Sequence, residues 1–581
     1  MNRPIQAEPV LVPGVARTTA GWRRLRPQDV QIYRICEDVT GLLICGMVIF
    51  SPWAFGTTQT WAIWTMNIAG YLLGLMLACK LVVRNLKGYQ PSRWEIKQSK
   101  PGVHEHNGRP KPSVDDTSLP ASSEGEKGGR RHRSEEIRKL VRRKRSRDLG
   151  QLTRALIVLT FAVLGFCLVS VLNARSSYHP QQLNFTYYQN TIRWLPSSLD
   201  SGRTWKVFWN YLALACAFWA LWDWLLGKTS EEEKAERQAA AQRATTSREG
   251  VTQAETHHES RASRALGREP FPARLRQLFW VLSINGGLLA IESIVQRLSG
   301  SDKLLFLVQP HVNVEGETQF GPYAYRGNAA QYFNLLWPAC LGFWWTLEQA
   351  GEFRRKLPKL LLFCVVLMAT AAIVSTSRGG AMITVGIFGA GIIGLFSAQF
   401  VFPPGRDVRR GSRVALRWLI GCGLVALVLG FALGWKQLSP RLGGIAAGFE
   451  GRELMSERAR PMADDYAWYG TGPGTFETVF QLYRFSTDVY WPAQLHNDWL
   501  ETRITFGCVG SLLIWTALLL VLLRWFWRGG FHAGGRFMLL TWLAVAGVLT
   551  HARYDFPFQI YSLVFLFLVI CAVLFNLSHK P

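Results

Sequence analysis

Several cationic and small residues lie together at the ends of apolar runs, where they are suited to bind a phosphate group. Arg378 lies in the segment 375–380 (Ser-Thr-Ser-Arg-Gly-Gly), which joins two apolar runs. Small residues let the backbone approach a ligand, and the helix expected to begin near residue 381 adds its N-terminal dipole and free N–H groups. We predict that Arg378 and this helix end bind a phosphate group. The alternative is an interfacial arginine paired with a lipid phosphate.

Arg326 opens an earlier apolar run in the same way, in the segment 325–328 (Tyr-Arg-Gly-Asn). Two charge-assisted contacts, each worth about 1.5–3 kcal/mol, would hold a diphosphate and stabilise it as it leaves. We predict that Arg326 and Arg378 share a diphosphate, with Arg458 as a third contact, and that this arrangement needs no metal or other cofactor.

The candidate general base is His496, in the segment 494–501 (Gln-Leu-His-Asn-Asp-Trp-Leu-Glu). Nearby cations disfavour protonation of an imidazole, so His496 is predicted to accept the proton of an attacking hydroxyl. Assistance of this kind is worth about 10²- to 10⁴-fold in rate. A structural histidine is the alternative interpretation. Asn497, Asp498 and Glu501 are predicted to support His496. The carboxylate that orients the ring is left open among Asp498, Glu501, Asp464 and Asp465.

A glycine-rich segment at 470–476 (Gly-Thr-Gly-Pro-Gly-Thr-Phe) superficially resembles a dinucleotide-binding loop. It follows no buried strand, and it is expected outside the cell, where nicotinamide cofactors are not kept. We predict instead that Gly472 and Gly474 let the backbone lie against a sugar or a phosphate.

Membrane-spanning helices must position these residues. The chain is 49% hydrophobic and contains 24 Trp. Its apolar runs of roughly 16 to 22 residues are long enough to cross about 30 Å of hydrocarbon. The predicted fold is therefore an all-α, polytopic transmembrane bundle of about twelve spans. The spans are expected at 39–55, 61–83, 155–172, 207–226, 278–295, 329–347, 360–374, 381–402, 418–435, 508–525, 537–549 and 558–575.

Positive charge indicates the orientation of these spans. The formal net charge of +25 is concentrated in alternate connections, as expected for cytoplasmic loops, and this location argues against nucleic-acid binding. With a cytoplasmic N-terminus, Arg326, Arg378 and His496 all fall on the outer side. Further polar residues expected at outer span ends are Arg460, Arg503, His551, Arg553 and Asp555.

The domain organisation follows from the spans and their connections. The inside connections at 84–154 and 227–276 are rich in charge, and we expect disorder or loose helix there. The long outer connection at 436–507 is expected to form short helices over the outer mouth and to carry the catalytic base. The remaining units are a cytoplasmic segment at 1–38, spans 1–2 at 39–83, spans 3–4 at 155–226, spans 5–9 at 277–435, and spans 10–12 with a short cytoplasmic tail at 508–581.

From residue 324 to 575 these motifs resemble the O-antigen ligase and O-antigen polymerase superfamily of integral membrane glycan transferases. The resemblance implies that Arg326 and Arg378 hold the diphosphate of a lipid-linked donor and that His496 activates the acceptor hydroxyl. The long cytoplasmic connections depart from the family pattern. The resemblance rests on Arg-Gly at 326, Ser-Arg-Gly-Gly at 377, Gly-x-Gly-x-Gly-Thr-Phe at 470, His-Asn-x-x-Leu-Glu at 496 and Gly-x-x-Gly at 507.

The implied function is a metal-independent glycosyltransferase of the bacterial inner membrane that moves a glycan from undecaprenyl diphosphate to an acceptor hydroxyl on the periplasmic face. The acceptor is left open among lipid A core, another glycan, which would make the protein a polymerase, and a protein hydroxyl. A glycolipid transporter or flippase is the rival from another class; such proteins keep ionisable residues near the membrane midplane and often show repeated halves. A metal-dependent transferase would rely on Asp464 and Asp465, which lack a third ligand.

Overall fold

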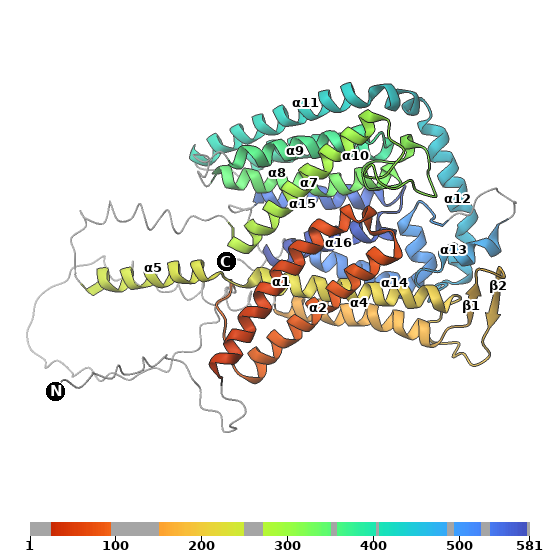
Figure 1. The fold of residues 1–581 in the computed structure, drawn as a ribbon, viewed down its shortest axis with the longest axis horizontal. Coiled ribbons are helices and arrows are strands. Elements are labelled where there is room, and N and C mark those ends of the chain that lie inside the picture. The colour runs from red at the N-terminus through yellow and green to blue at the C-terminus, as the bar shows by residue number, and fades with distance from the viewer. Residues whose placement is uncertain are drawn as a thin grey trace, which may run out of the picture.

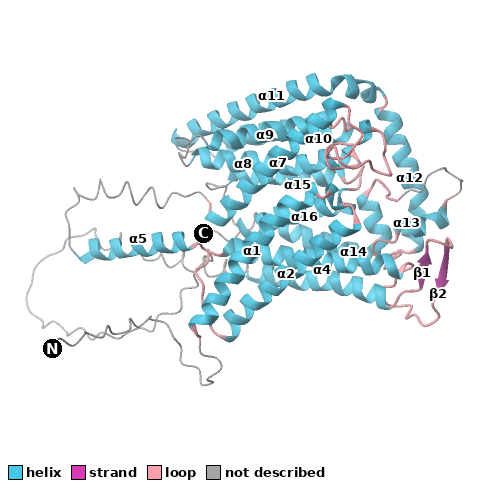
Figure 2. Ribbon diagram, viewed as in Figure 1, coloured by secondary structure: helices cyan, strands magenta, loops and turns pink. Residues whose placement is uncertain are grey.

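The computed structural model describes residues 25–94, 150–248, 271–349, 357–401, 406–484, 493–524 and 535–577. In these ranges the chain forms a bundle of long helices, and its named strands make one small hairpin (Figure 1). Figure 2 shows how far helix dominates the architecture. The predicted all-α polytopic bundle is confirmed.

Each of the twelve predicted spans coincides with a helix in the described ranges. By length and composition, seven helices there could cross a membrane on their own, and shorter apolar helices accompany them. The twelve are α1 (Pro27–Trp53), α2 (Thr60–Leu86), the helix Gly150–Leu172, α4 (Ser201–Leu226), α7 (Ala273–Ser299), α8 (Arg326–Gln349), α9 (Leu357–Val374), α10 (Arg378–Val401), α11 (Arg406–Gly443), α14 (Asp498–Leu523), α15 (Gly535–His551) and α16 (Tyr561–Leu577).

Two helices extend further into the outer connection than the apolar runs indicate. α14 begins at Asp498 rather than at 508, and α11 continues to Gly443. The first turn of α14 contains two acids, which the helix dipole stabilises but a hydropathy pattern does not register. The motif around His496 therefore lies at the start of a helix.

α8 lies at the centre of the bundle. It packs against α7, α9, α10, α15 and α16, and its Phe333, Trp337, Phe343 and Trp344 are buried. α16 is buried along its whole length and packs against both α4 and α8, so it joins the α1–α2–α4 group to the α7–α11 group. Large apolar side chains on the outside, such as Leu42, are suited to contact lipid.

The two ends of the bundle carry different elements. At one end lie α12 (Ile445–Asp465), α13 (Phe476–Val479) and the hairpin, and at the other lies α5 (Ser230–Arg248) (Figure 1). In the predicted outer connection α13 is a short helix, as expected, whereas α12 is 21 residues long. α5 is a helix in the second inside connection; residues 95–149 and 249–270 lie outside the described ranges. In the hairpin, β1 (Ser176–His179) pairs antiparallel with β2 (Asn184–Tyr187), with Tyr178 opposite Phe185. The 3-10 turns are η2 (Phe55–Thr57), η3 (Gly316–Thr318), η5 (Phe480–Tyr483) and η7 (Pro557–Gln559).

A kink in α14 joins this helix to the glycine-rich loop. Gly507 has φ 63° and ψ −167°, and a Cβ on it would lie 2.5 Å from the backbone N of Gly470. The N–H of Thr471 donates to the carbonyl of Ile504 at 2.9 Å. The glycines at 470 and 507 therefore permit close backbone packing between two elements of this chain.

An ionic cluster joins α1, α2 and α4 near the ends opposite the hairpin. Buried Lys80 lies 3.2 Å from Glu37 and 2.8 Å from Asp223, and Arg84 lies 2.7 Å from Asp223. Burying charges is tolerated when each has an opposite partner, so this cluster fixes how the three helices pack.

Candidate active site

A buried carboxylate, Asp555, links four side chains. It is 1% exposed and lies between α15 and α16. Its Oδ1 accepts a hydrogen bond from Nδ1 of His496 at 3.1 Å. Its Oδ2 accepts from Oη of Tyr325 at 3.3 Å and from Nε2 of Gln331 at 3.2 Å, and Nε2 of His551 lies 3.7 Å away. Because an ionised carboxylate only accepts, His496 carries its proton on Nδ1 and presents Nε2 as a base.

Hydrogen bonds fix the backbone on both sides of His496. Its φ of 56° lies in the left-handed region. Asn497 caps α14 by accepting from the N–H of Leu500 at 3.2 Å, and Glu501 accepts from the N–H of Leu495 at 2.9 Å. A strained residue persists where surrounding contacts over-determine its conformation. Asn497 and Glu501 therefore position the imidazole through the backbone.

Asp498, the first residue of α14, fastens the segment that carries Asp555. Its carboxyl group is buried, and its oxygens accept hydrogen bonds from the N–H of Phe558 at 2.7 Å and from Nε2 of Gln559 at 3.1 Å. Its own N–H donates to the carbonyl of Ala552 at 2.8 Å. These bonds hold the α15–α16 connection against the start of α14.

Asp555 orients His496, and no neighbouring acid in the sequence does so within the described residues. The two acids of α14 bond to backbone or to the α15–α16 connection, Asp465 accepts from Oη of Tyr483 at 2.7 Å, and Asp464 is exposed. The orienting carboxylate stands 59 positions further along the chain. Sequence proximity favours local candidates, whereas a helix bundle brings together ends that are distant in sequence.

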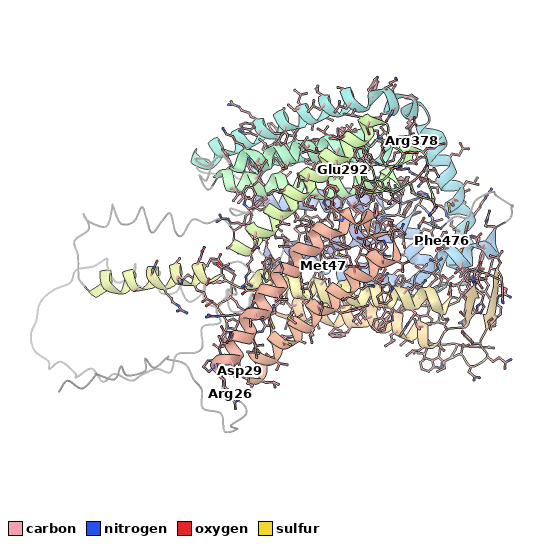
Figure 3. All side chains as sticks on the ribbon, in the orientation of Figure 1. Arg26, Asp29, Met47, Glu292, Arg378 and Phe476 are labelled. Carbon is pink, nitrogen blue, oxygen red and sulfur yellow. The ribbon has the colours of Figure 1, made fainter. Side chains whose placement is uncertain are left out.

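A cavity of about 130 Å³ lies beside this cluster, where the beginning of α10, the beginning of α12 and the end of α15 meet. Figure 3 shows Arg378 at the same end of the bundle as Phe476 of α13. The wall is mostly apolar, with two guanidinium groups and one imidazole. The lining residues are Arg378, Gly379, Met382, Ile383, Gly448, Phe449, Arg452, Thr550, His551 and Tyr554.

Two arginines are anchored at the wall of this cavity. Nη1 of Arg378 donates to the carbonyl of Arg441 at 3.4 Å and to that of Gly444, at the C-terminal end of α11. Nη2 of Arg452 donates to Oη of Tyr325 at 3.2 Å. Arg452 is therefore connected through Tyr325 to the carboxylate that orients the base.

Arg326 lies near Arg378 but does not line the cavity. Its Nη1 donates to the carbonyl of Glu317 at 2.7 Å, and its guanidinium is close enough to Arg378 and Arg441 for mutual repulsion. Arg441 is 3.1 Å from the exposed carboxylate of Glu317. The cluster holds more positive than negative charge, so a bound anion would stabilise it.

Glycines make the room in which these side chains meet. A Cβ on Gly379 would lie 2.5 Å from Nε2 of His551, and a Cβ on Gly448 would lie 2.6 Å from Nη2 of Arg378. A Cβ on Gly327 would lie 2.8 Å from Oδ2 of Asp555. Real Cβ contacts do not fall this short, so any side chain at these positions displaces a group of the site.

Three predicted site residues lie elsewhere. Arg458 is exposed on α12 and does not line the cavity; it is six positions, or about 120° around the helix axis, from Arg452, which does. A Cβ on Gly472 would lie 2.6 Å from Oγ of Ser198, and one on Gly474 would lie 2.5 Å from Cγ2 of Val207. Packing within the chain accounts for both glycines, and their contact with a sugar or phosphate stays a prediction.

The electrostatics of the cluster keep Asp555 ionised. Burial by itself raises the pKa of Asp555, but the hydrogen bond from His496 and the charges of His551 and Arg452 hold that pKa below its usual value. Burial, followed by the charge of Asp555, raises the pKa of Tyr325. At neutral pH the pair is therefore a carboxylate and a neutral phenol, and the carboxylate can stabilise an imidazolium as it forms.

The sequence pattern identifies His551 and Asp555 only as outer polar residues, and it does not single out Arg452. The sequence does contain a pattern that places Arg452 on the inward face of its helix. Arg452, Ser456 and Ala459 follow the i, i+4, i+7 spacing of one helix face, and the latter two are 3% and 0% exposed. No comparable signal assigns Asp555 to His496, because their pairing depends on tertiary packing.

Residues 363–515 match the family model described as O-antigen ligase. This stretch contains Arg378, Arg452 and His496, whereas Arg326, His551 and Asp555 lie outside it. The match confirms the superfamily resemblance. The comparisons found no match among curated proteins or among solved structures.

Proposed function

Because the chain carries the O-antigen ligase domain, we propose that it is an integral membrane glycosyltransferase that moves a glycan from undecaprenyl diphosphate to an acceptor hydroxyl on the periplasmic face of the inner membrane. One observation carries the proposal: the arginine-walled cavity and His496 are joined through one buried carboxylate, because His551 of the cavity wall lies 3.7 Å from Asp555 and Asp555 accepts a hydrogen bond from His496. Such an arrangement supports binding a phosphorylated donor next to a base.

In this proposal the arginines bind the diphosphate of the donor. Arg378 and Arg452 line the cavity, and Arg326 adds charge at its edge. The apolar wall, including Met382 and Phe449, suits the first isoprene units of the lipid. Arg452 takes the place that the sequence assigned to Arg458. As the bond to the sugar breaks, charge grows on the diphosphate, and fixed guanidinium groups stabilise it without reorganisation.

His496 acts as the general base. Its Nε2 accepts the proton of the acceptor hydroxyl while the acceptor oxygen bonds to the anomeric carbon and the bond from that carbon to the diphosphate breaks. Asp555 stabilises the imidazolium that results. Attack opposite the leaving group inverts the anomeric carbon. We propose that the reaction needs no metal, and activity that survives EDTA would support this.

The acceptor is a hydroxyl of lipid A core, of another glycan or of a protein, and each would use the same base. Mass spectrometry of envelope glycans from a strain lacking this chain distinguishes them. Loss of glycan from lipid A core identifies a ligase, shortened chains identify a polymerase, and loss of glycan from a protein identifies a protein glycosyltransferase.

Arg378→Ala and His496→Ala test the proposal. We expect each to accumulate lipid-linked glycan in membranes of the complemented deletion strain, with Arg326→Ala weakening donor binding. Arg458→Ala is the matched control, since that arginine is exposed on α12 away from the cavity. Unchanged glycan turnover in both the Arg378 and His496 variants, at equal protein level, contradicts the assigned roles.

A further inference from the structure

His551, the last residue of α15, belongs to both halves of the site. Its side chain is 4% exposed and lines the cavity with Arg378 and Arg452. Its Nε2 lies 3.7 Å from Oδ2 of Asp555, while its Nδ1 is buried and has no hydrogen-bond partner among the described residues. A buried polar atom without a hydrogen-bond partner destabilises the structure that contains it. The ring of His551 is part of the cavity wall, so a ligand that fills the cavity lies next to this ring and its unpartnered nitrogen.

We propose that His551 is a donor-binding residue: its Nδ1 donates a hydrogen bond to the donor diphosphate while its Nε2 donates to Asp555. The inference rests on the proposed function, because it takes a lipid diphosphate as the occupant of the cavity. Gly379 leaves the space for the ring next to the first N–H groups of α10, which also favour an anion.

This geometry couples donor binding to protonation. Ionised phosphate and carboxylate oxygens only accept hydrogen bonds, so a ring placed between the diphosphate and Asp555 must carry a proton on each nitrogen. With Asp555 as its one acceptor, the ring needs a single proton. Binding of the diphosphate therefore takes up about one proton at His551.

The charges around His551 support this coupling. Asp555 favours a second proton on the ring, whereas Arg378 and Arg452 oppose it. A bound diphosphate neutralises the two arginines and adds its own negative charge, so the balance shifts toward the imidazolium. The charged groups next to the ring of His551 are Asp555 of the α15–α16 connection, Arg378 of α10 and Arg452 of α12. Two further titratable groups, Tyr325 and His496, form hydrogen bonds with Asp555. Tyr554 also lines the cavity.

The test measures proton uptake when farnesyl diphosphate binds to the purified full-length chain. Calorimetric titration at about pH 8, where a free imidazole is neutral, in two buffers of different ionisation enthalpy gives the number of protons taken up. His551→Gln keeps a donor near the position of Nε2 and loses the one at Nδ1, whereas His551→Asn does the reverse. His179→Gln, in the hairpin, is the matched control.

We expect the wild type and His179→Gln to take up about one proton more than either His551 variant. His551→Gln should bind farnesyl diphosphate at least about tenfold more weakly, because it loses a hydrogen bond to a charged group, and His551→Asn should keep most of the affinity. Equal proton uptake in wild type and both variants overturns the role of His551 alone. Absence of farnesyl diphosphate binding to the wild type overturns the proposed function as well.

Discussion

Asp555→Asn removes the charge at the centre of the site and keeps its shape. In the wild type, Oδ1 of Asp555 accepts from Nδ1 of His496 at 3.1 Å and from the N–H of Phe556 at 3.2 Å. The amide oxygen of Asn can accept both of these hydrogen bonds. The new NH₂ group would face Nε2 of Gln331, but the Oε1 of Gln331 is buried and has no hydrogen-bond partner in the part of the chain that the structure describes. A flip of the Gln331 amide satisfies both groups, so we expect the fold to be retained.

The size of the effect follows from the distance to the imidazole. A carboxylate 3.1 Å from an imidazolium stabilises it by about 5 kcal/mol at an effective dielectric constant of about 20, and by about 2.5 kcal/mol at about 40. The ring of His496 is 32% exposed, which favours the lower value. At about 1.4 kcal/mol per tenfold, kcat should fall by about 10² to 10⁴. The donor KM should rise as well, because Asp555 favours the protonated form of His551, while the arginines remain in place.

The assay follows the release of undecaprenyl diphosphate from lipid-linked glycan in membranes that contain the native acceptor. Asp465→Asn is the control, because Asp465 is an exposed acid of the same outer face that bonds to Tyr483. The unfolding midpoint in detergent checks that both variants fold. A kcat for Asp555→Asn within about threefold of wild type would refute the base mechanism, because stabilisation of a His496 imidazolium by Asp555 requires a much larger decrease in kcat.

The other predictions concern donor binding, metal dependence and stability. Gly448→Ala should raise the donor KM about tenfold or more, because its Cβ would lie 2.6 Å from Nη2 of Arg378, whereas Gly451→Ala on the same helix, with nothing within 4 Å, should leave steady-state kinetics unchanged. EDTA dialysis should leave turnover unchanged; loss of activity that Mg²⁺ restores would contradict the metal-independent mechanism. Asp223→Asn should lower the free energy of unfolding by about 3–5 kcal/mol, because it removes one of the carboxylates that pair with buried Lys80. Thermal unfolding in detergent measures this loss. The KM of the protein that remains folded should be unchanged.

The acidity of the medium provides one more test of the charge on Asp555. The pKa of Asp555 is below its usual value in the folded chain, so its charge contributes stability that is present at neutral pH, above the unfolded pKa. This contribution is lost as the pH falls through the lowered pKa. The unfolding midpoint of wild type should therefore approach that of Asp555→Asn on acidification, and a constant gap down to strongly acidic pH would contradict the ionised state.

The number and approximate positions of the helices could be predicted from the sequence, because long apolar runs have one stable arrangement in a bilayer. The helix ends could not. α14 begins at Asp498 because Asn497 caps it and its first-turn acids suit the helix dipole, and these are polar features that a hydropathy pattern excludes. The roles of Asn497 and Glu501 near His496 follow from the same helix start.

The sequence predicts one membrane face for the site residues, which stays a prediction, but it does not predict which residues are partners within the site. Alternating spans place the outer ends of all helices on one face, and Arg378 and His496 were assigned to that face from positive charge alone. Which ends touch depends on packing. α8 lies against α15 and α10, and that packing, rather than any spacing in the sequence, brings Gln331 and Gly379 next to His551 and its neighbour Asp555.

The match at residues 363–515 covers Arg378, Arg452 and His496 but ends before Asp555, the carboxylate that accepts the hydrogen bond of His496. A buried carboxylate in a bundle of apolar helices is costly unless donors surround it, so Asp555 must have recruited several. Among the groups around Asp555, His496 and His551 each have a second ring nitrogen that can take a proton. Examining which groups surround this buried carboxylate therefore identifies His496, which the match covers, and also His551, which the match leaves out.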